Sequence, residues 1–306
     1  MGHASDGDGG RGRSPRLKMD KPKLKTVIGT YAHTQLLKDG TVKPKSFDFE
    51  FEEVPVIIKA FRRMVRGSEF DIAELAMTTY VCAREHGKPF TAIAVFPMRG
   101  FHHGAILVNT KAGITTPKDL EGRKVGVNRG YTVTTGLWAR SILQHEYGVD
   151  LKKVTWVLSG DEHVAEYRPP SNVVSMEAGK TLEGMLDSGE IAAAVGLKDV
   201  SGPDIRPLIP NAAEAAKEWH KRTGIYPINH TIVIRNDILA AHPDLAPDLF
   251  TAFVAAKHGT EMPPYGIMPN RKALDALVAN CVEQGILSHA VPVDELFVAS
   301  TRGLMG

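Results

Sequence analysis

The chain has 306 residues, of which 43% are hydrophobic and 24% charged, and this composition is typical of a globular protein with one large or two moderate domains. The formal net charge of +2 gives no electrostatic argument for binding nucleic acid or an anionic membrane. Cys82 and Cys281 are far apart and form no CxxC pair, so neither a disulfide framework nor a zinc knuckle is indicated. No apolar run approaches the roughly 20 residues that a membrane helix needs.

The first 23 residues are rich in glycine, arginine and aspartate and contain no apolar stretch of the kind found in secretory signals. We therefore predict that residues 1–23 are a disordered extension. A cytoplasmic location is the expectation that goes with this interpretation.

Strand and helix patterns alternate along the rest of the chain. In the first part, β-rich or alternating runs predict strands at 25–31, 47–55, 70–77 and 90–97, and helical spacing predicts helices at 56–67 and 78–88. The middle part predicts strands at 103–109, at the end of 116–128 and at 152–159, a helix within 128–148, and a helix followed by a strand in 180–197. The last part predicts an extended run at 205–210, a strand at 228–235, and helices at 211–224, 236–259, 270–285 and 292–301.

This alternation predicts an α/β protein with parallel sheets covered by helices on both faces. Residues 107–200 are long enough to form their own βαβαβ lobe, and residues 24–106 and 201–306 would form the other lobe. Two lobes joined by two crossings imply a cleft, which is a common place for a ligand. GxxxxGK[ST] does not occur, and the one GxGxxG match, at residues 7–12, lies in the N-terminal extension and follows no predicted strand, which argues against dinucleotide and nucleoside-triphosphate binding.

Two long runs carry a family resemblance: "FRRMVRGSEFDIAELAMTTYVCAREHGKPFTAIAVFPMRGFHHGAILVN" and "PKDLEGRKVGVNRGYTVTTGLWARSILQHEYGVDLKKVTWVLSG". Together they closely resemble the 4,5-dihydroxyphthalate decarboxylase family, a branch of the type II periplasmic-binding-protein fold. The resemblance implies a two-lobed, hinge-bending fold that binds an aromatic acid between its lobes and decarboxylates it without a cofactor. The chain departs from the family at His33 and at His102, where the family tends to carry arginine, so a substrate with fewer carboxylates or a different chemistry is an alternative.

Candidate site residues gather at the ends of predicted strands and at one helix start. Arg99 would hold a carboxylate, and His102 or His103 would protonate a ring carbon. Glu74 and His33 are the other candidate catalytic groups, as acid, base or carrier of a hydroxyl proton. The candidate substrate-binding residues, which offer hydroxyls, helix N–H groups, imidazoles or a guanidinium, are Thr34, Tyr131, Thr132, Thr134, Thr135, His163, Arg168 and His230.

The residues and the resemblance together predict non-oxidative decarboxylation of a hydroxylated aromatic acid, in which the ring is protonated before CO₂ leaves. The alternative is a solute-binding protein of an ABC-type uptake system for a small organic anion. We expect no cofactor. A divalent metal held by the histidines and Glu74 is left open, although no HxxxH or HExxH spacing gives it local support. The expected partner is a small aromatic acid, with neither nucleic acid nor membrane, and a homodimer is left open.

Overall fold

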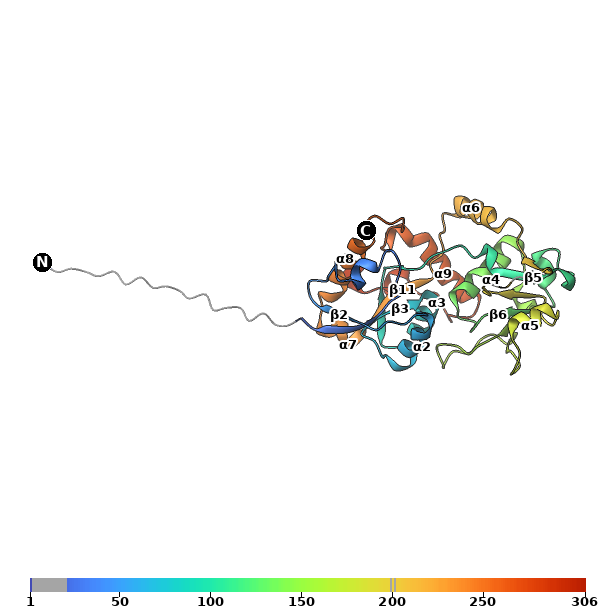
Figure 1. Ribbon diagram of the computed structural model, residues 1–306, viewed down its shortest axis with the longest axis horizontal. Coiled ribbons are helices and arrows are strands. Elements are labelled where there is room, and N and C mark those ends of the chain that lie inside the picture. The colour runs from blue at the N-terminus through green and yellow to red at the C-terminus, as the bar shows by residue number, and fades with distance from the viewer. Residues whose placement is uncertain (2–20, 199, 201) are drawn as a thin grey trace.

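The computed structural model describes residue 1 and residues 21–198, 200 and 202–306. Two lobes, each built around its own sheet, lie side by side (Figure 1). The predicted disordered segment falls largely on residues 2–20, which lie outside the described residues, and Lys23 already begins the first strand.

The first lobe contains a five-stranded sheet in the order β2-β1-β3-β11-β4. Its strands are β1 (Lys23–Val27), β2 (Asp48–Phe51), β3 (Ile72–Ala76), β4 (Phe90–Ile93) and β11 (His230–Arg235). The first three are parallel, whereas β11 runs antiparallel to both of its neighbours. All five residues of β3 are buried, as expected for a central strand.

The second lobe contains a six-stranded sheet in the order β10-β5-β9-β6-β7-β8. Its strands are β5 (Ile106–Asn109), β6 (Lys124–Val127), β7 (Thr155–Leu158), β8 (Val173–Ser175), β9 (Ala193–Val195) and β10 (Ile205–Pro207). Four of them are parallel, and β5 is antiparallel to both β9 and β10. The second sheet therefore occupies residues 106–207.

The predicted α/β class is confirmed, and both sheets contain the expected parallel strands, but both are mixed, because β11 and β5 run antiparallel to their neighbours. A helix that crosses directly between two strands of one sheet makes them parallel. Strand β11 instead enters the first sheet after the chain has crossed back from the second lobe, so no such rule fixes its direction.

Nine α-helices occur in the described residues: α1 (Gln35–Lys38), α2 (Ile58–Gly67), α3 (Met77–Glu85), α4 (Thr134–Tyr147), α5 (Leu182–Asp187), α6 (Ala212–Thr223), α7 (Asn236–Ala241), α8 (Leu245–Ala256) and α9 (Arg271–Glu283). The single helix expected over 236–259 is two helices, and the break contains Pro243, which cannot continue a helix interior. The helix expected over 292–301 is instead two 3₁₀ turns, η6 (Val293–Leu296) and η7 (Ala299–Thr301).

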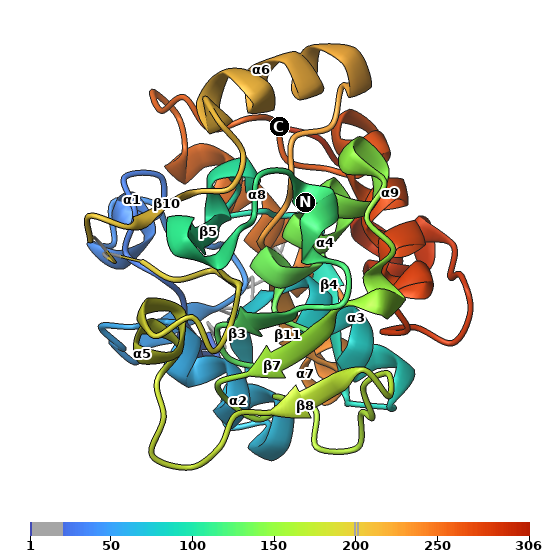
Figure 2. The ribbon, with the colours of Figure 1, turned by 90° about the vertical axis from the view of Figure 1, so that its right-hand side faces the viewer.

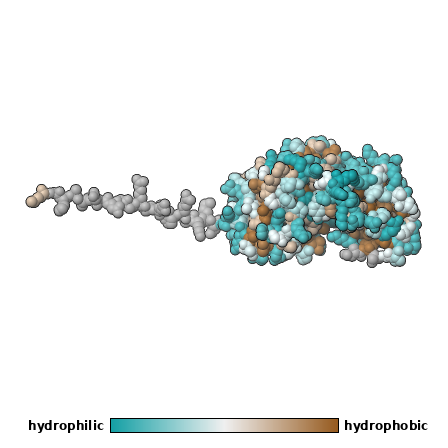
Figure 3. Space-filling view, turned by 90° about the horizontal axis from the view of Figure 1, so that it is seen from above, coloured by the Kyte–Doolittle hydropathy of each residue, from teal (hydrophilic) through white to brown (hydrophobic). Residues whose placement is uncertain are grey.

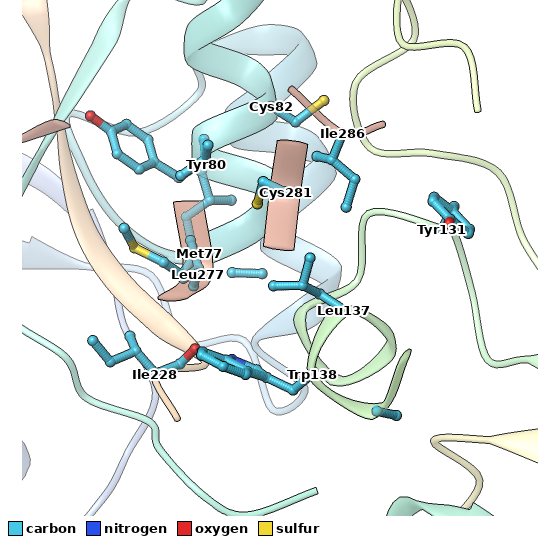
Figure 4. Close-up of a cluster of buried hydrophobic side chains, with 14 of the residues drawn as sticks. Met77, Tyr80, Cys82, Tyr131, Leu137, Trp138, Ile228, Leu277, Cys281 and Ile286 are labelled. Carbon is cyan, nitrogen blue, oxygen red and sulfur yellow. The ribbon is translucent and has the colours of Figure 1, made fainter. Parts of the chain in front are cut away.

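One hydrophobic core runs through both lobes. Met77 of α3, Trp138 of α4 and Leu277 of α9 belong to the same buried cluster (Figure 4). The Trp138 indole N–H also donates to the carbonyl of Ile228 at 3.1 Å. Seen from the end of the second lobe, α6 lies across the top of the molecule and strands β7 and β8 face the viewer (Figure 2). The lobes are thus joined by packing as well as by the two chain crossings.

Candidate functional site between the lobes

A cavity of about 980 Å³ lies where the two lobes meet. The first lobe lines it with the start of α2, the second lobe with the segments before α4 and after β7 and β9, and the chain crossings contribute residues 98–102 and 229–230. Seen from above, the surface is indented between the lobes (Figure 3). The predicted ligand cleft therefore exists in the structure.

The cleft is strongly cationic. Its lining carries five lysine or arginine side chains, Lys59, Arg62, Arg99, Arg129 and Lys198. Among the described lining residues the only carboxylate is Asp161, and two guanidiniums already neutralise it, Arg62 at 2.7 Å and Arg66 at 3.1 Å. A ligand that matches this lining carries negative charge.

A buried carboxylate–imidazole pair forms one wall of the cleft. Glu74, in the middle of β3, is fully buried, and His230, the first residue of β11, donates from Nδ1 to Glu74 Oε1 at 2.6 Å. The Tyr31 hydroxyl and the Gly29 N–H donate to the same carboxylate, each at 2.8 Å. Since an ionised carboxylate only accepts, Nδ1 carries the hydrogen and Nε2 is the ring nitrogen left for a ligand. His230 lines the cleft.

Burial by itself would raise the pKa of Glu74. The hydrogen bond and charge of His230, with the bonds from Gly29 and Tyr31, outweigh burial and lower the pKa, so the carboxylate is ionised. Close packing makes this arrangement possible, because a Cβ on Gly29 would lie 2.3 Å from the Tyr31 ring. The sequence analysis placed Glu74 and His230 in separate roles, and the structure brings them together.

The start of α4 already holds an anion of the protein. The carboxylate of Glu162, which is buried, accepts from the backbone N–H groups of Tyr131 and Thr132 and from the Thr132 hydroxyl at 2.6 Å. Gly130 allows the carboxylate to come this close, because a Cβ at this position would lie 2.6 Å from Glu162 Oε2. The prediction that this helix start attracts an anion fits the geometry, but at Tyr131 and Thr132 the anion is internal.

The next two threonines behave differently from each other. The Thr134 side chain bonds across the lobes, accepting from the Thr78 hydroxyl at 2.8 Å. Thr135, one residue further along α4, lines the cleft. Thr135 is therefore the threonine of this stretch that faces a ligand in the main cavity.

Arg129 was missed by the sequence analysis although it stands in the same "NRGYTVTTG" stretch. Its side chain lines the cleft, and within the described part of the chain its guanidinium makes no hydrogen bond or ion pair; Nε is buried without a partner. Burial lowers the pKa of Arg129. Its φ of +73° is unusual for a non-glycine residue, and such strain is often found at functional sites. The neighbouring threonines were a stronger pattern, so only the tertiary structure singles out Arg129.

His102 and His163 also line the cleft. His102 Nε2 lies 3.2 Å from Asn229 Oδ1, and burial lowers its pKa to about 4. His163 Nδ1 lies 3.4 Å from the Thr79 hydroxyl, and burial, followed by the charge of Arg62, lowers its pKa to about 4. Both rings therefore offer hydrogen-bonding nitrogens at the cleft, and the proton-donor role of His102 stays a prediction.

His103, the other residue named as a ring-protonating acid, does not line the cleft. It is buried, and its ring packs against Trp219 of α6 at a centroid distance of 5.4 Å. His103 is adjacent to His102 in the sequence, but its side chain packs against α6 instead of lining the cleft. The role proposed for His103 therefore has no support in this geometry.

His33 and Thr34 support the loop that holds Tyr31. His33 stacks on Tyr31 at 5.1 Å, and one ring nitrogen lies 2.8 Å from the carbonyl of Pro97. The Thr34 hydroxyl donates to the Gly29 carbonyl at 2.8 Å and accepts from the Tyr31 N–H. Neither lines the main cavity, so their contact with the site passes through Tyr31 and Glu74.

The guanidiniums of Arg99 and Arg168 already form hydrogen bonds with other groups of the protein. Arg99 lines the cleft, but its terminal nitrogens donate to Asn270 Oδ1 and to the Tyr226 carbonyl, each at 2.5 Å, and only its Nε lacks a partner. Arg168 is exposed on a loop and donates to carbonyls of Ala165 and Tyr167. The geometry favours Arg129 over both as the carboxylate anchor.

A small recess adjoins the cleft and shares part of its lining. Its volume of about 20 Å³ is enough for roughly one water molecule or one ligand oxygen. Five of its lining residues also line the main cavity, Arg129, Thr135, His163, Asn229 and His230. A guanidinium, a helix start and three polar side chains therefore converge on one point.

Two further observations on the described residues concern metal binding and membrane-spanning helices. No three His, Cys, Asp or Glu side chains among them lie close enough together to hold a metal ion. No helix in this part of the chain has the length and apolar character needed to cross a bilayer.

Comparison with known proteins first gives the class of protein. Residues 46–262 match the family described as periplasmic substrate-binding proteins of phosphonate ABC transporters, and the chain belongs to this family. The desulfurization enzyme DSZB has a similar fold, with a TM-score of 0.53 and 12% identity over 91% of this chain and 96% of that chain. These matches agree with a two-lobed periplasmic-binding-protein-like fold of type II, as the sequence predicted.

Two curated relatives then narrow the family. The chain is 32% identical over 254 residues to a 4,5-dihydroxyphthalate decarboxylase of Comamonas testosteroni, covering 78% of this chain and 76% of the relative. It is 31% identical over 218 residues to a 4,5-dihydroxyphthalate decarboxylase of Pseudomonas putida, covering 66% of this chain and 83% of the relative. The chain belongs to the 4,5-dihydroxyphthalate decarboxylase family, which confirms the resemblance drawn from the sequence.

Proposed function

We propose that the protein is a decarboxylase that removes a carboxylate, without oxidation, from a hydroxylated aromatic acid. The observation that carries the proposal is the Glu74–His230 pair on the wall of a cationic cleft, with the unpaired guanidinium of Arg129 at the same recess. The family membership adds support, since both curated relatives are named as decarboxylases.

The proposed reaction needs a proton and a place for an electron pair. His230, as imidazolium, transfers the proton on Nε2 to the ring carbon that bears the carboxylate, while the substrate hydroxyl in the ortho or para position keeps its own proton and becomes a protonated ketone. The bond from that carbon to the carboxylate then breaks, its electron pair restores the aromatic ring, and CO₂ leaves. Neutral His230 regains a proton from water. No external oxidant or reductant enters this balance.

Glu74 acts through His230 and not on the substrate. Its carboxylate faces Nδ1, which fixes the ring orientation and stabilises the imidazolium that donates the proton. This makes Glu74 a positioning residue and His230 the proton donor.

Arg129 and the start of α4 would orient the acid. A guanidinium binds a carboxylate through paired N–H donors, and the positive end of the helix dipole at Thr135 adds to the attraction. Phe61, which packs edge-on against His230 at 5.0 Å, also lines the recess and leaves it partly apolar. Such a site replaces part of the water around the carboxylate and favours departure of neutral CO₂.

The second candidate is a binding protein for an organic anion, because the matching family is described as substrate-binding proteins of a transporter. The same cleft, Arg129 and helix start would serve this function. In that case His230 would be a recognition group, and no carbon–carbon bond would break.

The deciding experiment measures CO₂ release from a panel of hydroxybenzoates and hydroxyphthalates, with and without added divalent metal. The wild-type protein is compared with His230→Gln, which cannot donate a proton as imidazolium. His145→Gln is the matched control, because His145 also pairs with a glutamate, Glu283 at 2.9 Å, but is exposed and outside the cleft.

We expect release of CO₂ from at least one acid, a loss of about 10²-fold or more in kcat for His230→Gln, and no change for His145→Gln. Saturable binding of an acid without CO₂ release would instead support the binding protein. Full activity of His230→Gln would remove His230 from the mechanism.

A further inference from the structure

The cleft has two chemically different parts. We call the part at the recess its floor, and the part of the main cavity lined by residues that do not reach the recess its mouth. The recess at the floor joins the main cavity through polar or charged side chains. Six large apolar side chains line the main cavity and not the recess: Val56, Ile57, Ile58, Met98, Phe101 and Leu197. A single small anion bound at the recess would leave these side chains without a ligand contact, and of the six only Ile57 is buried by the protein itself.

Two of these apolar side chains are unusually exposed. Val56 is 49% exposed and Phe101 is 38% exposed, which places both among the few large hydrophobic residues that the described surface shows to solvent. Contiguous exposed apolar surface in a soluble protein commonly marks a binding site. Phe101 is held in place by packing against Tyr226 at 5.0 Å, so it forms a preformed wall.

The two lobes are in direct contact at the cleft. Contacts between the lobes are already made at the floor, where the Thr78 hydroxyl donates to Thr134 at 2.8 Å and Arg66 donates to the carbonyl of Glu162 at 2.7 Å. With these contacts in place, the cavity still measures about 980 Å³, which is at the upper end of the range for pockets that hold drug-sized ligands.

We infer that the substrate is an aromatic acid with an apolar substituent, alkyl or aryl, that extends from the ring away from the reacting carboxylate and lies against Val56, Phe101 and Leu197. This inference rests on the proposed function, since it takes the carboxylate to the recess beside His230 and Arg129. The opposite end of the ring then points to the apolar mouth. The position that fits is para to the carboxylate.

The test uses 2-hydroxybenzoates that carry hydrogen, methyl, ethyl or propyl para to the carboxylate. The control series carries the same groups at the free ortho position. Both turnover and the dissociation constant by calorimetry are measured for each compound. Because each buried methylene contributes about 0.8 kcal/mol, we expect kcat/KM to rise and the dissociation constant to fall about fourfold per carbon in the para series only.

A variant checks that the gain arises at the mouth. Val56→Thr keeps the side-chain shape and replaces a methyl group with a hydroxyl, and it should reduce the ratio of kcat/KM for the propyl compound to that for the unsubstituted acid about fourfold. Val174→Thr is the matched control, because Val174 on β8 is 43% exposed and lies outside the cleft.

The outcomes separate the two proposals. Turnover of the unsubstituted acid with no gain along the para series would overturn the apolar subsite and leave the decarboxylase standing. Tighter binding along the para series without any turnover would support the subsite and overturn the decarboxylase. Equal gains in the para and ortho series would also contradict the subsite.

Discussion

The two sides of the cleft each place a buried glutamate next to a cleft histidine, but with opposite consequences. On the first lobe, Glu74 accepts directly from His230 at 2.6 Å. On the second lobe, Glu162 turns its carboxylate to the start of α4, and the adjacent His163 faces three arginines whose charges lower its pKa together with burial. Both rings pack edge-on against Phe61, at 5.0 and 6.0 Å.

The difference shows that a buried carboxylate has two separate uses at a site of this kind. Glu74 accepts from a ring that lines the cleft and fixes the orientation of that ring, so it belongs to the proposed chemistry. Glu162 satisfies backbone N–H groups and the helix dipole, so it belongs to the scaffold. The sequence alone does not distinguish these uses, because Glu74 within β3 and Glu162 after β7 are single glutamates whose partners come from distant segments.

The largest expected effect separates the two glutamates by activity. The substitution Glu74→Gln removes the negative charge beside His230. We expect kcat to fall by about 10²- to 10⁴-fold. A drop confined to folding stability, with kcat within threefold of wild type, would contradict the assignment.

The next effect concerns the missed arginine. For Arg129→Gln we expect KM for an active acid to rise about 10- to 100-fold, because a charge-assisted hydrogen bond contributes about 1.5–3 kcal/mol. Arg168→Gln, on the exposed loop, is the control and should leave KM unchanged. An unchanged KM in Arg129→Gln would return the role of anchor to another cation of the cleft.

The neutral histidines predict how stability depends on pH. The folded pKa values of His163 and His102, about 4, lie below the ordinary value of 6.5, so the unfolded chain binds protons first as the pH falls. Their contribution to stability is complete above about pH 6.5 and is lost toward pH 4, by about 2 kcal/mol for each ring between pH 7 and pH 5. Urea unfolding at these two pH values measures the loss.

The same unfolding experiment on His163→Asn should show a smaller loss than wild type. His145→Asn, at the exposed pair with Glu283, should show the wild-type loss. Equal pH dependence in wild type and His163→Asn would mean that folding does not lower the pKa of His163.

The smallest effect is expected on the scaffold side. Glu162→Gln weakens the bonds to Tyr131 and Thr132, and we expect it to lower the free energy of unfolding by about 1–2 kcal/mol with kcat little changed. Glu166→Gln, at a neighbouring exposed glutamate paired with Lys88, is the control and should lower the free energy of unfolding less than Glu162→Gln does. A large loss of kcat in Glu162→Gln would make the two glutamates alike.

The sequence determined the class of fold, most helices and strands, and the existence of a cleft. Periodicity is a local property, and the apolar pattern of a strand such as β3 or a helix such as α4 can be read within a few residues. The resemblance identified the family through long matching runs. The candidate list also contained Glu74, Thr135, His102, His163 and His230, which the structure gathers at or directly behind the cleft.

Only the tertiary structure decided which side chains face the ligand and which pair with each other. Glu74 and His230 are 156 positions apart and meet because β11 lies antiparallel beside β3. His102 and His103 are adjacent, yet one lines the cleft and the other packs beneath α6. The direction of a side chain and its partners depend on contacts between distant segments, and one sequence read locally carries no measure of those contacts.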